Sequence, residues 1–189
     1  MTELWDLYDK FRQKTGRFHE RGKPVPEGYL HIIIHVWIRD REGRYLMSQR
    51  HPKKSFPLMW ECTGGAVIAG EDSLTGAMRE VKEELGVTLD RDKGVLFKSE
   101  CQESHKVFYD VWLFQYDQEG PLVLQPEEVV AARWMNENEI RKCAREAVSY
   151  THLSSSVDER PIFENDRVGG KPCERGERSQ DYGEDELSV

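Results

Sequence analysis

The fold of this chain is decided by the stretch Gly65-Ala-Val-Ile-Ala-Gly-Glu71-Asp-Ser-Leu-Thr-Gly-Ala-Met-Arg79-Glu80-Val-Lys-Glu83-Glu84-Leu-Gly86-Val87, a glycine followed by an acid-rich helix. At 3.6 residues per turn, Glu80, Glu83 and Glu84 share one side of this helix. Three neighbouring carboxylates repel one another unless a cation lies among them, and such oxygen ligands suit Mg²⁺ or Mn²⁺. Arg79 stands four residues before Glu83, which favours a charge-assisted hydrogen bond between them. A solvated amphipathic helix carries similar charges, so the charges alone leave both interpretations open.

The residues around these glutamates predict where the helix begins and ends. Asp72 or Ser73 is the expected N-cap, and Glu71 lies at the positive end of the helix dipole. Gly86 is a natural C-cap. Upstream, the pair Gly64-Gly65 allows a tight turn and a close approach to a ligand. Five apolar residues recur at helical spacing and are expected to pack on a sheet: Leu74, Ala77, Met78, Val81 and Leu85.

The whole pattern resembles the signature of the Nudix hydrolases, which is a glycine, five residues, a glutamate, seven residues, then Arg-Glu-aliphatic-x-Glu-Glu-x-Gly-aliphatic. Every specified position is filled, by Gly65, Glu71, Arg79, Glu80, Val81, Glu83, Glu84, Gly86 and Val87. The resemblance implies a loop–helix–loop that binds a divalent metal. It also implies cleavage of a nucleoside diphosphate that is linked to another moiety, X.

The same resemblance implies roles for the individual side chains. Glu83 and Glu84 would be the principal metal ligands, helped by Glu80 and the carbonyl of Gly64, with Mg²⁺ or Mn²⁺ as cofactor. Many family members bring a further glutamate to the metals from outside the signature, and Glu128 stands where that residue is expected. An ordinary loop acid is the alternative for Glu128. Glu80 or Glu128 would be the general base, so the expected catalytic residues are Glu80, Glu84 and Glu128, with Glu71, Arg79 and Gly86 supporting the motif.

A basic segment precedes the glycines. Arg50, Lys53 and Lys54 are expected to neutralise a bound diphosphate, and Gly65 to let the backbone approach it. The alternative is a solvated basic loop.

Further features narrow the resemblance to the isopentenyl-diphosphate isomerase branch and its hydrolase relatives. They are Leu30-His31 leading into a strand, Trp37 on that strand, and Pro52-Lys-Lys-Ser-Phe-Pro-Leu-Met-Trp60. The isomerase needs a catalytic cysteine a few residues after this tryptophan and then a histidine metal ligand, but Cys62 comes too early. His31, without a partner histidine, is expected to be structural or to line the substrate site. A hydrolase is therefore favoured, with an isomerase and a non-catalytic nucleotide-binding sensor as alternatives.

The remaining elements follow from β-branched and aromatic residues. Residues 29–39 are expected to form a central strand with residues 44–49 as its hairpin partner, and residues 95–101, 106–116 and 131–135 further strands. Asn136 is expected to cap a helix beginning near Glu137. Residues 3–14 form a polar segment with apolar side chains roughly on one face, broken by Thr15-Gly16-Arg17. These elements predict a mixed α/β (α+β) fold, and the resemblance implies a Nudix-type α/β/α sandwich.

Composition sets limits on partners and location. The net charge of −8 argues against a nucleic-acid groove, whereas a small-molecule diphosphate substrate is compatible with it. No run of eighteen apolar residues and no basic–apolar leader is present, so we expect a cytoplasmic protein without membrane contact. A homodimer is left open. The four cysteines have no paired spacing and are expected to be reduced: Cys62, Cys101, Cys143 and Cys173.

The chain divides near residue 147. Residues 1–147 are expected to form the hydrolase domain, while residues 148–189 hold ten acidic and five basic side chains and few aliphatic ones, which predicts disorder. One interpretation of this tail is an interaction segment. The other is a sequence foreign to the domain, because Val148-Ser-Tyr-Thr-His-Leu153 is what one frame of a common transposon sequencing adapter encodes.

Overall fold

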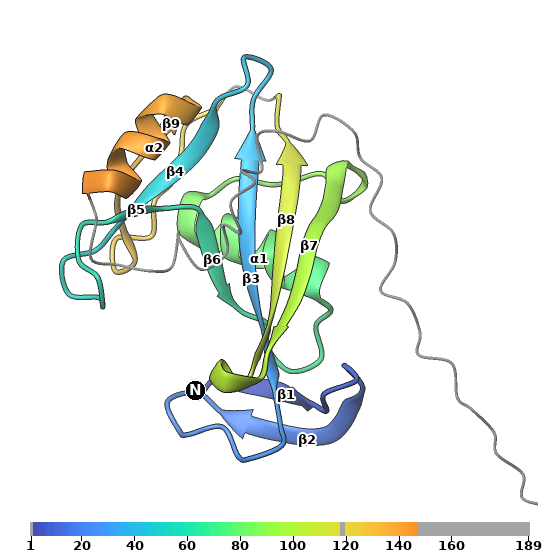
Figure 1. The fold of residues 1–189 in the computed structure, drawn as a ribbon. Helices are drawn as coiled ribbons and strands as arrows, with labels where there is room; N and C mark the ends of the chain where they lie inside the picture. Colours follow the sequence, from blue (N-terminus) through green and yellow to red (C-terminus); the bar gives the residue numbers. More distant parts are fainter. Residues whose placement is uncertain (1, 118–119, 147–189) are drawn as a thin grey trace, which may run out of the picture.

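The computed structural model describes residues 2–117 and 120–146, which build a seven-stranded mixed sheet, a separate hairpin and two α-helices (Figure 1). The central strand, β3 (His31–Arg39), runs parallel to β8 (Val107–Gln115) along its whole length. The edge strand β7 (Gly94–Gln102) pairs antiparallel with β8, and β6 (Thr63–Ala66) pairs antiparallel with β3. The glycines that precede the acidic helix belong to β6 and therefore lie beside β3, the central strand of the sheet.

A second group of strands continues the sheet on the other side of β3. The strand β4 (Tyr45–Arg50) pairs antiparallel with β9 (Val129–Met135) and with the short β5 (Trp60–Glu61). The predicted hairpin between β3 and β4 forms only at its turn, where Arg39 pairs with Tyr45. Beyond that pair β4 leaves β3 and takes β9 as its main partner, so β6 fills the place beside β3.

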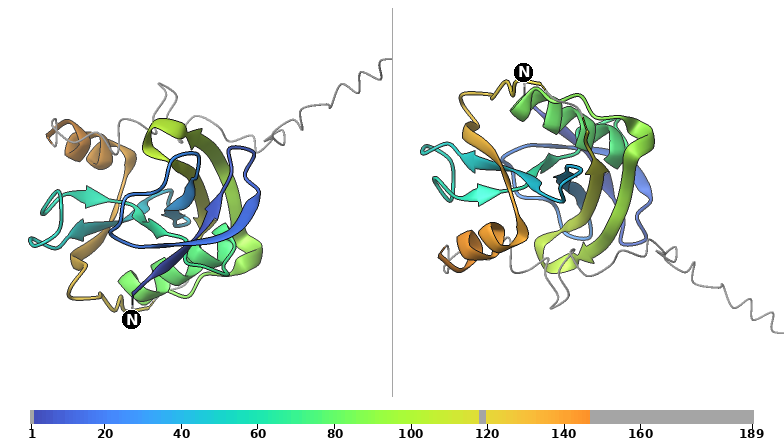
Figure 2. Two further views of the ribbon diagram at one scale, coloured as in Figure 1. Left: turned by 90° about the horizontal axis from the view of Figure 1, so that it is seen from below. Right: turned by 90° about the horizontal axis from the view of Figure 1, so that it is seen from above.

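The two helices cover opposite faces of the sheet, as the predicted sandwich requires (Figure 2). The long helix α1 (Ser73–Leu85) buries Ala77, Val81 and Leu85 in one apolar core with alternate residues of β3. The helix α2 (Glu137–Glu146) contributes Ile140 to a second core that contains Trp37. Short 3₁₀ segments occur at Arg91–Lys93 and Glu103–His105.

Both predicted caps of α1 are present. The Asp72 side chain accepts a hydrogen bond from the Thr75 backbone N–H at 2.7 Å. Gly86 ends the helix in the left-handed conformation, with φ +69°, and its N–H donates to the Lys82 carbonyl. Asn136 also caps α2, because its side chain accepts from the Glu139 N–H while the Glu139 carboxylate accepts from the Asn136 N–H.

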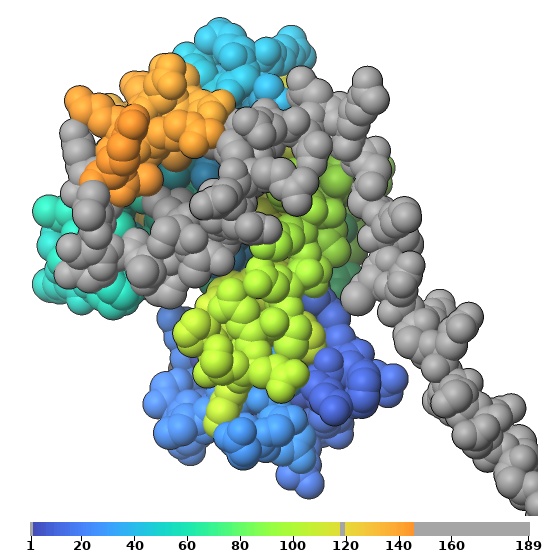
Figure 3. Space-filling view, viewed as in Figure 1, coloured from blue at the N-terminus to red at the C-terminus, as the bar shows by residue number. Residues whose placement is uncertain are grey.

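The prediction of a single polar segment over residues 3–14 was wrong. These residues belong to a β-hairpin, in which β1 (Leu4–Tyr8) pairs with β2 (Lys14–Glu20), and Thr15-Gly16-Arg17 lie within the second strand instead of breaking the element. The hairpin lies at one end of the sheet (Figure 1), and on the surface it lies beneath the turn between β7 and β8 (Figure 3). Leu4–Tyr8 is rich in aromatic and aliphatic residues, which favours a strand, but its burial does not alternate from residue to residue, so the local sequence gives no period-two signal.

Other expectations concern surface properties. The cysteines within the described residues, Cys62, Cys101 and Cys143, are free, as expected, whereas Cys173 lies outside the described part of the chain. No helix among the described residues is long and apolar enough to cross a membrane. The predicted disordered or foreign tail, residues 148–189, also lies outside the described residues.

Candidate active site

The site begins where Gly65 meets the acidic helix. Gly65 on β6 lies directly against Glu80 on α1, so that a Cβ atom at position 65 would overlap the Glu80 carboxylate. Gly64 is similarly close to the backbone of β3, because a Cβ there would come within 2.8 Å of the Ile34 carbonyl oxygen. The absence of side chains at both glycines lets the strand, the helix and the central sheet meet at one point.

Arg79 braces three of the four motif glutamates. Its Nε donates to Glu71 at 3.0 Å, and one terminal nitrogen donates to Glu80 at 2.9 Å and to Glu83 at 3.0 Å. Its other terminal nitrogen donates to the Ala66 carbonyl. Burial alone would lower the pKa of Arg79, but the hydrogen bond with Glu71 and the charge of Glu80 raise it overall. The predicted Arg79–Glu83 contact is confirmed, and Arg79 also ties the helix to the glycine loop.

Glu84 lies apart from this brace and is the most buried motif carboxylate, at 6% exposure. Burial, followed by the charges of Glu80 and Glu61, raises the pKa of Glu84 to about 8, while Lys54 opposes that rise. Burial also raises the pKa of Glu80, against the influence of Arg79. Burial is the largest cause at both carboxylates, and at Glu84 the neighbouring carboxylates Glu80 and Glu61 add to it.

The donor set fits a divalent cation. Carboxylates whose pKa values are raised, first by burial and then by neighbouring carboxylates, are stabilised in their charged form by a cation placed among them, and oxygen ligands suit Mg²⁺ or Mn²⁺. In the present side-chain arrangement, no three Asp, Glu, His or Cys side chains of the described residues gather closely enough to hold an ion. Arg79 supplies the positive charge beside Glu80 and Glu83 instead. The assignment of Glu80, Glu83, Glu84 and the Gly64 carbonyl as metal ligands stays a prediction.

Glu128 and Lys54 come together from two distant loops and form an ion pair. Backbone hydrogen bonds fix both loops to the site. The Gln125 N–H donates to the Glu84 carbonyl at 3.0 Å, and the His51 N–H donates to the Glu128 carbonyl at 2.9 Å. Burial, then the charge of Arg50, lowers the pKa of Lys54. Lys54 and Glu128, both predicted from the sequence, thus lie close to Glu84, and in the structure they pair with each other.

The remaining basic residues differ in their surroundings. Arg50 donates two hydrogen bonds to Glu61, at 2.8 and 2.9 Å, and a third to the Ser55 carbonyl. It therefore positions Glu61 as well as facing the site. Lys53 is exposed on the loop that follows β4. Binding of a diphosphate by Arg50, Lys53 and Lys54 stays a prediction.

Comparison with known proteins identifies the family. The model of the NUDIX domain matches residues 29–154. The chain belongs to the Nudix hydrolase family. It is 35% identical over 158 residues to an uncharacterized Nudix hydrolase of Listeria monocytogenes, an alignment that covers 80% of this chain and 92% of that protein. It is also 35% identical over 153 residues to Nudix hydrolase 3 of Arabidopsis thaliana, covering 74% of this chain and 20% of that protein.

Solved structures agree on the fold. The crystal structure of DR0079 from Deinococcus radiodurans superposes with a TM-score of 0.61 and 24% identity, covering 78% of this chain and 90% of that one. The Nudix fold, with its mixed sheet and two helices, is therefore as predicted. None of these relatives carries a name that specifies isopentenyl-diphosphate isomerisation.

Sequence reasoning missed Glu61 among the residues near the Nudix motif. Glu61 follows Trp60 on β5, is held by Arg50 and contributes to the raised pKa of Glu84. The sequence does show an acidic residue three positions before Gly64 in a short extended segment. The direction in which the Glu61 side chain points, however, depends on the pairing of Ser48 with Glu61, which the local sequence does not reveal.

Gly65→Ala tests the contact between the Nudix loop and helix. The added methyl group would displace the Glu80 carboxylate, the end of a flexible side chain, so the protein is expected to fold while turnover falls by about 100-fold. Steady-state kinetics and thermal unfolding would measure the two effects. Gly120→Ala is a matched control, because a Cβ at Gly120 meets nothing within 4 Å. If a folded Gly65→Ala protein kept the parental turnover, the position of the Glu80 carboxylate would not matter for catalysis.

Proposed function

We propose that this protein hydrolyses a pyrophosphate bond in a nucleoside diphosphate linked to another moiety, X, with Mg²⁺ or Mn²⁺ as cofactor. The observation that carries the proposal is the complete acidic motif on α1, packed through Glu80 against Gly65 and braced by Arg79. A surface stripe of glutamates would not bury Glu84 or surround an arginine with three carboxylates. Membership of the Nudix family supports the same reaction class.

The reaction is the addition of water across a P–O–P bridge. A water oxygen forms a bond to one phosphorus, the bridging P–O bond breaks, and the leaving phosphate keeps its electron pair. Glu80 or Glu128 accepts the proton that the water loses, as a general base, and returns it to solvent or to the leaving oxygen. A bound divalent cation supplies charge stabilisation on the attacking and leaving oxygens.

The chain's own residues prepare this reaction. Arg79 holds Glu71, Glu80 and Glu83 in place, so the carboxylates are oriented before the substrate arrives. Lys54 is close enough to Glu84 to oppose the rise of its pKa, and its positive charge is proposed to contact the diphosphate. Because Lys54 is paired with Glu128, substrate phosphate would compete for Lys54 and release Glu128 to act as a base.

A panel of nucleoside diphosphate compounds, with Mg²⁺ present and phosphate-containing products as the readout, tests the function. The expected result is cleavage of at least one compound at its pyrophosphate bond. Tight binding of nucleotides without any cleavage across the panel would favour the non-catalytic sensor instead.

We also propose that the protein is one of the hydrolases that are related to the isopentenyl-diphosphate isomerases. Leu30 leads into β3, which begins at His31, and Trp37 lies on the same strand, as that resemblance implies. Cys62 is the cysteine nearest the position of an isomerase thiol. It is 6% exposed, and burial raises its pKa strongly, which disfavours a reactive thiolate. These features favour hydrolysis over isomerisation.

Cys62→Ala separates the two reactions. We expect no isopentenyl-diphosphate isomerisation by the parent protein and near-parental pyrophosphate hydrolysis by the variant, because hydrolysis by activated water needs no thiol. Product analysis by nuclear magnetic resonance measures both. Isomerisation that is present in the parent and lost in Cys62→Ala would reverse the choice between hydrolase and isomerase.

We further propose a cytoplasmic protein whose partner is a small-molecule diphosphate and that binds neither nucleic acid nor membrane. The acidic balance of the chain, −8, supports the part of this proposal that concerns nucleic acid. A measurement of molecular mass in solution would test whether the protein forms a homodimer.

A further inference from the structure

A cavity of about 340 Å³ adjoins the proposed catalytic residues. Its walls come from β3, β6, β8, the loop between β4 and β5, and the N-terminal hairpin. Gly64, Gly65 and Glu61 line the cavity, and Gly65 also touches Glu80. A single ligand could therefore place a phosphate group near the glutamates and extend its other end into the cavity. The volume is at the lower end of the range for small-molecule sites, about 300–1,000 Å³, which suits one compact group.

The hairpin lies outside the matched NUDIX domain, which begins at residue 29, yet it supplies Trp5 and Arg21 to the cavity. Trp5 is held from both sides. The Leu4 carbonyl accepts from the Ala69 N–H at 2.7 Å, and the Asp6 carboxylate accepts from the Gly70 N–H at 2.9 Å. The hairpin is thus attached to the loop that precedes the catalytic helix, with Trp5 between the two attachment points.

A second contact orients the ring of Trp5. Its indole lies parallel to the His31 imidazole, with ring centroids 4.2 Å apart and 9° between the planes, and its N–H donates to Glu3 at 2.7 Å. The same Glu3 carboxylate accepts from Arg21. The turn of the hairpin is anchored as well, because Arg12 donates to the buried Asp110 at 2.8 Å. Trp5 is therefore a fixed wall of the cavity.

The chemistry of the lining favours a flat, uncharged ring. Six of its side chains are aromatic: Trp5, His31, His35, Phe56, Trp60 and Tyr109. Both arginines of the lining already have carboxylate partners, Arg21 with Glu3 and Arg50 with Glu61. Burial, then the charge of His19, lowers the pKa of His31 to about 4, so this imidazole is neutral at pH 7. A sugar or a second phosphate would need more polar partners, and an alkyl chain would not use the flat faces.

We propose that this cavity receives the base of a nucleotide substrate, with Trp5 and His31 as its aromatic wall, and that the N-terminal hairpin supplies, through Trp5, the ring on which the base stacks. The inference rests on the proposed hydrolysis of a nucleoside diphosphate and adds which end of that substrate the hairpin recognises. Base–aromatic stacking tolerates any base, and the edges of the neighbouring side chains then discriminate among them.

Binding measured without catalysis tests the inference separately from the reaction. Isothermal titration of the full chain in chelator would compare AMP, CMP, GMP and UMP with ribose 5-phosphate, which has the same phosphate but no base. At least one nucleotide is expected to bind about tenfold or more tightly than ribose 5-phosphate. Trp5→Ala is expected to remove that advantage, and Trp5→Phe to keep most of it because a ring remains.

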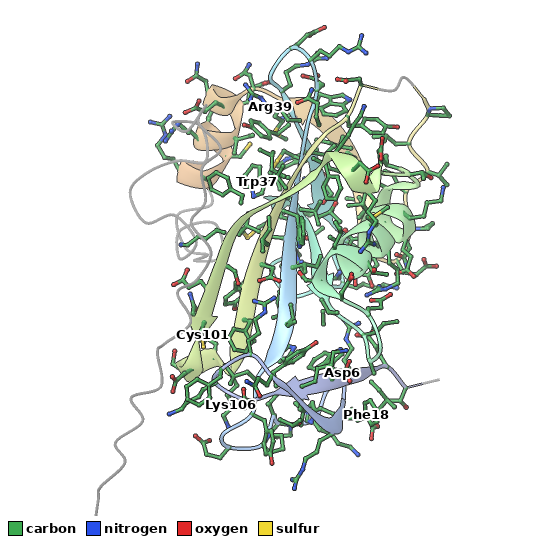
Figure 4. The ribbon with its side chains drawn as sticks, turned by 90° about the vertical axis from the view of Figure 1, so that its right-hand side faces the viewer. Asp6, Phe18, Trp37, Arg39, Cys101 and Lys106 are labelled. Carbon is green, nitrogen blue, oxygen red and sulfur yellow. The ribbon has the colours of Figure 1, made fainter. Side chains whose placement is uncertain are left out.

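Phe18→Ala is the matched control, since Phe18 is an aromatic residue on the same hairpin but is 61% exposed and does not line the cavity (Figure 4). It should bind nucleotides as the parent does. If ribose 5-phosphate binds as well as all four nucleotides, or if folded Trp5→Ala and Trp5→Phe both keep the parental preference, the assignment is wrong. Tighter binding of isopentenyl diphosphate than of any nucleotide would also overturn it, in favour of a hydrocarbon.

The two levels of the proposal fail differently. Metal-dependent hydrolysis with no dependence on the base would remove the cavity assignment and leave the hydrolase intact. Base-selective binding that depends on Trp5, without hydrolysis of any compound in the panel, would support the cavity assignment and count against the hydrolase.

Discussion

Glu84→Gln is expected to lower kcat by more than about 100-fold while the protein stays folded. Residues that merely orient a metal ligand typically contribute 10- to 100-fold, so removal of a ligand charge should cost more. Glutamine keeps the size of the side chain, which limits any change in packing around this buried position. Steady-state hydrolysis of a substrate found in the panel, at saturating Mg²⁺, measures the effect.

Two other substitutions calibrate that result. Glu42→Gln removes a carboxylate from an exposed turn and should leave kcat unchanged. Glu83→Gln removes a carboxylate that is half exposed and paired with Arg79. The change in kcat of this variant tests whether Glu83 is the second metal ligand, as predicted. Turnover of Glu84→Gln at the level of Glu42→Gln would move the metal site away from Glu84.

The second large effect expected of Glu84→Gln is on stability: although the variant loses activity, it should be more stable than the parent when no metal is present. The folded-state pKa of Glu84 is about 8, above its ordinary value of 4.5, so the folded protein retains a proton that the unfolded chain releases. This contribution to the free energy of unfolding is fully present below about pH 4.5 and is lost as the pH rises to about 8. Metal-free Glu84→Gln has no such loss. It should therefore exceed the parent in stability by a margin that grows from pH 5 to pH 8, on the order of a few kcal/mol.

Chemical denaturation in chelator, at several pH values, measures the difference between the two proteins. Subtracting the variant from the parent removes the contributions of the other titrating groups, such as Asp6 and Asp72, whose pKa values are lowered in the fold. A difference that is constant from pH 5 to pH 8 would show that Glu84 is already ionised in the metal-free fold. A positively charged ligand among the carboxylates should reduce the difference when Mg²⁺ is added.

The sequence predicted the catalytic helix well because its determinants are local. Asp72, Gly86 and the Arg79–Glu83 pair each act within one or two turns, and all three are found as expected. The burial of Ala77, Val81 and Leu85 also follows from helical spacing alone. The sequence also brought Lys54 and Glu128 to the same proposed site, although not as partners of each other.

The parts that the sequence did not predict depend on pairing between distant segments. β4 takes most of its hydrogen bonds from β9, more than seventy residues later, and this pairing sets the direction of its neighbour Glu61. Trp5 reaches the cavity only because the hairpin docks on Ala69 and Gly70. Neither arrangement leaves a periodic signal in the local sequence.

The metal dependence of hydrolysis tests the central claim most directly. The parent protein would be stripped with chelator, assayed on the substrate identified in the panel, and then titrated with Mg²⁺ or Mn²⁺ while the products are quantified. The account predicts no hydrolysis in chelator and recovery of full activity with either ion, because the proposed reaction uses a divalent cation held by the carboxylates around Glu84. Hydrolysis that continues at the parental rate under full chelation would contradict it.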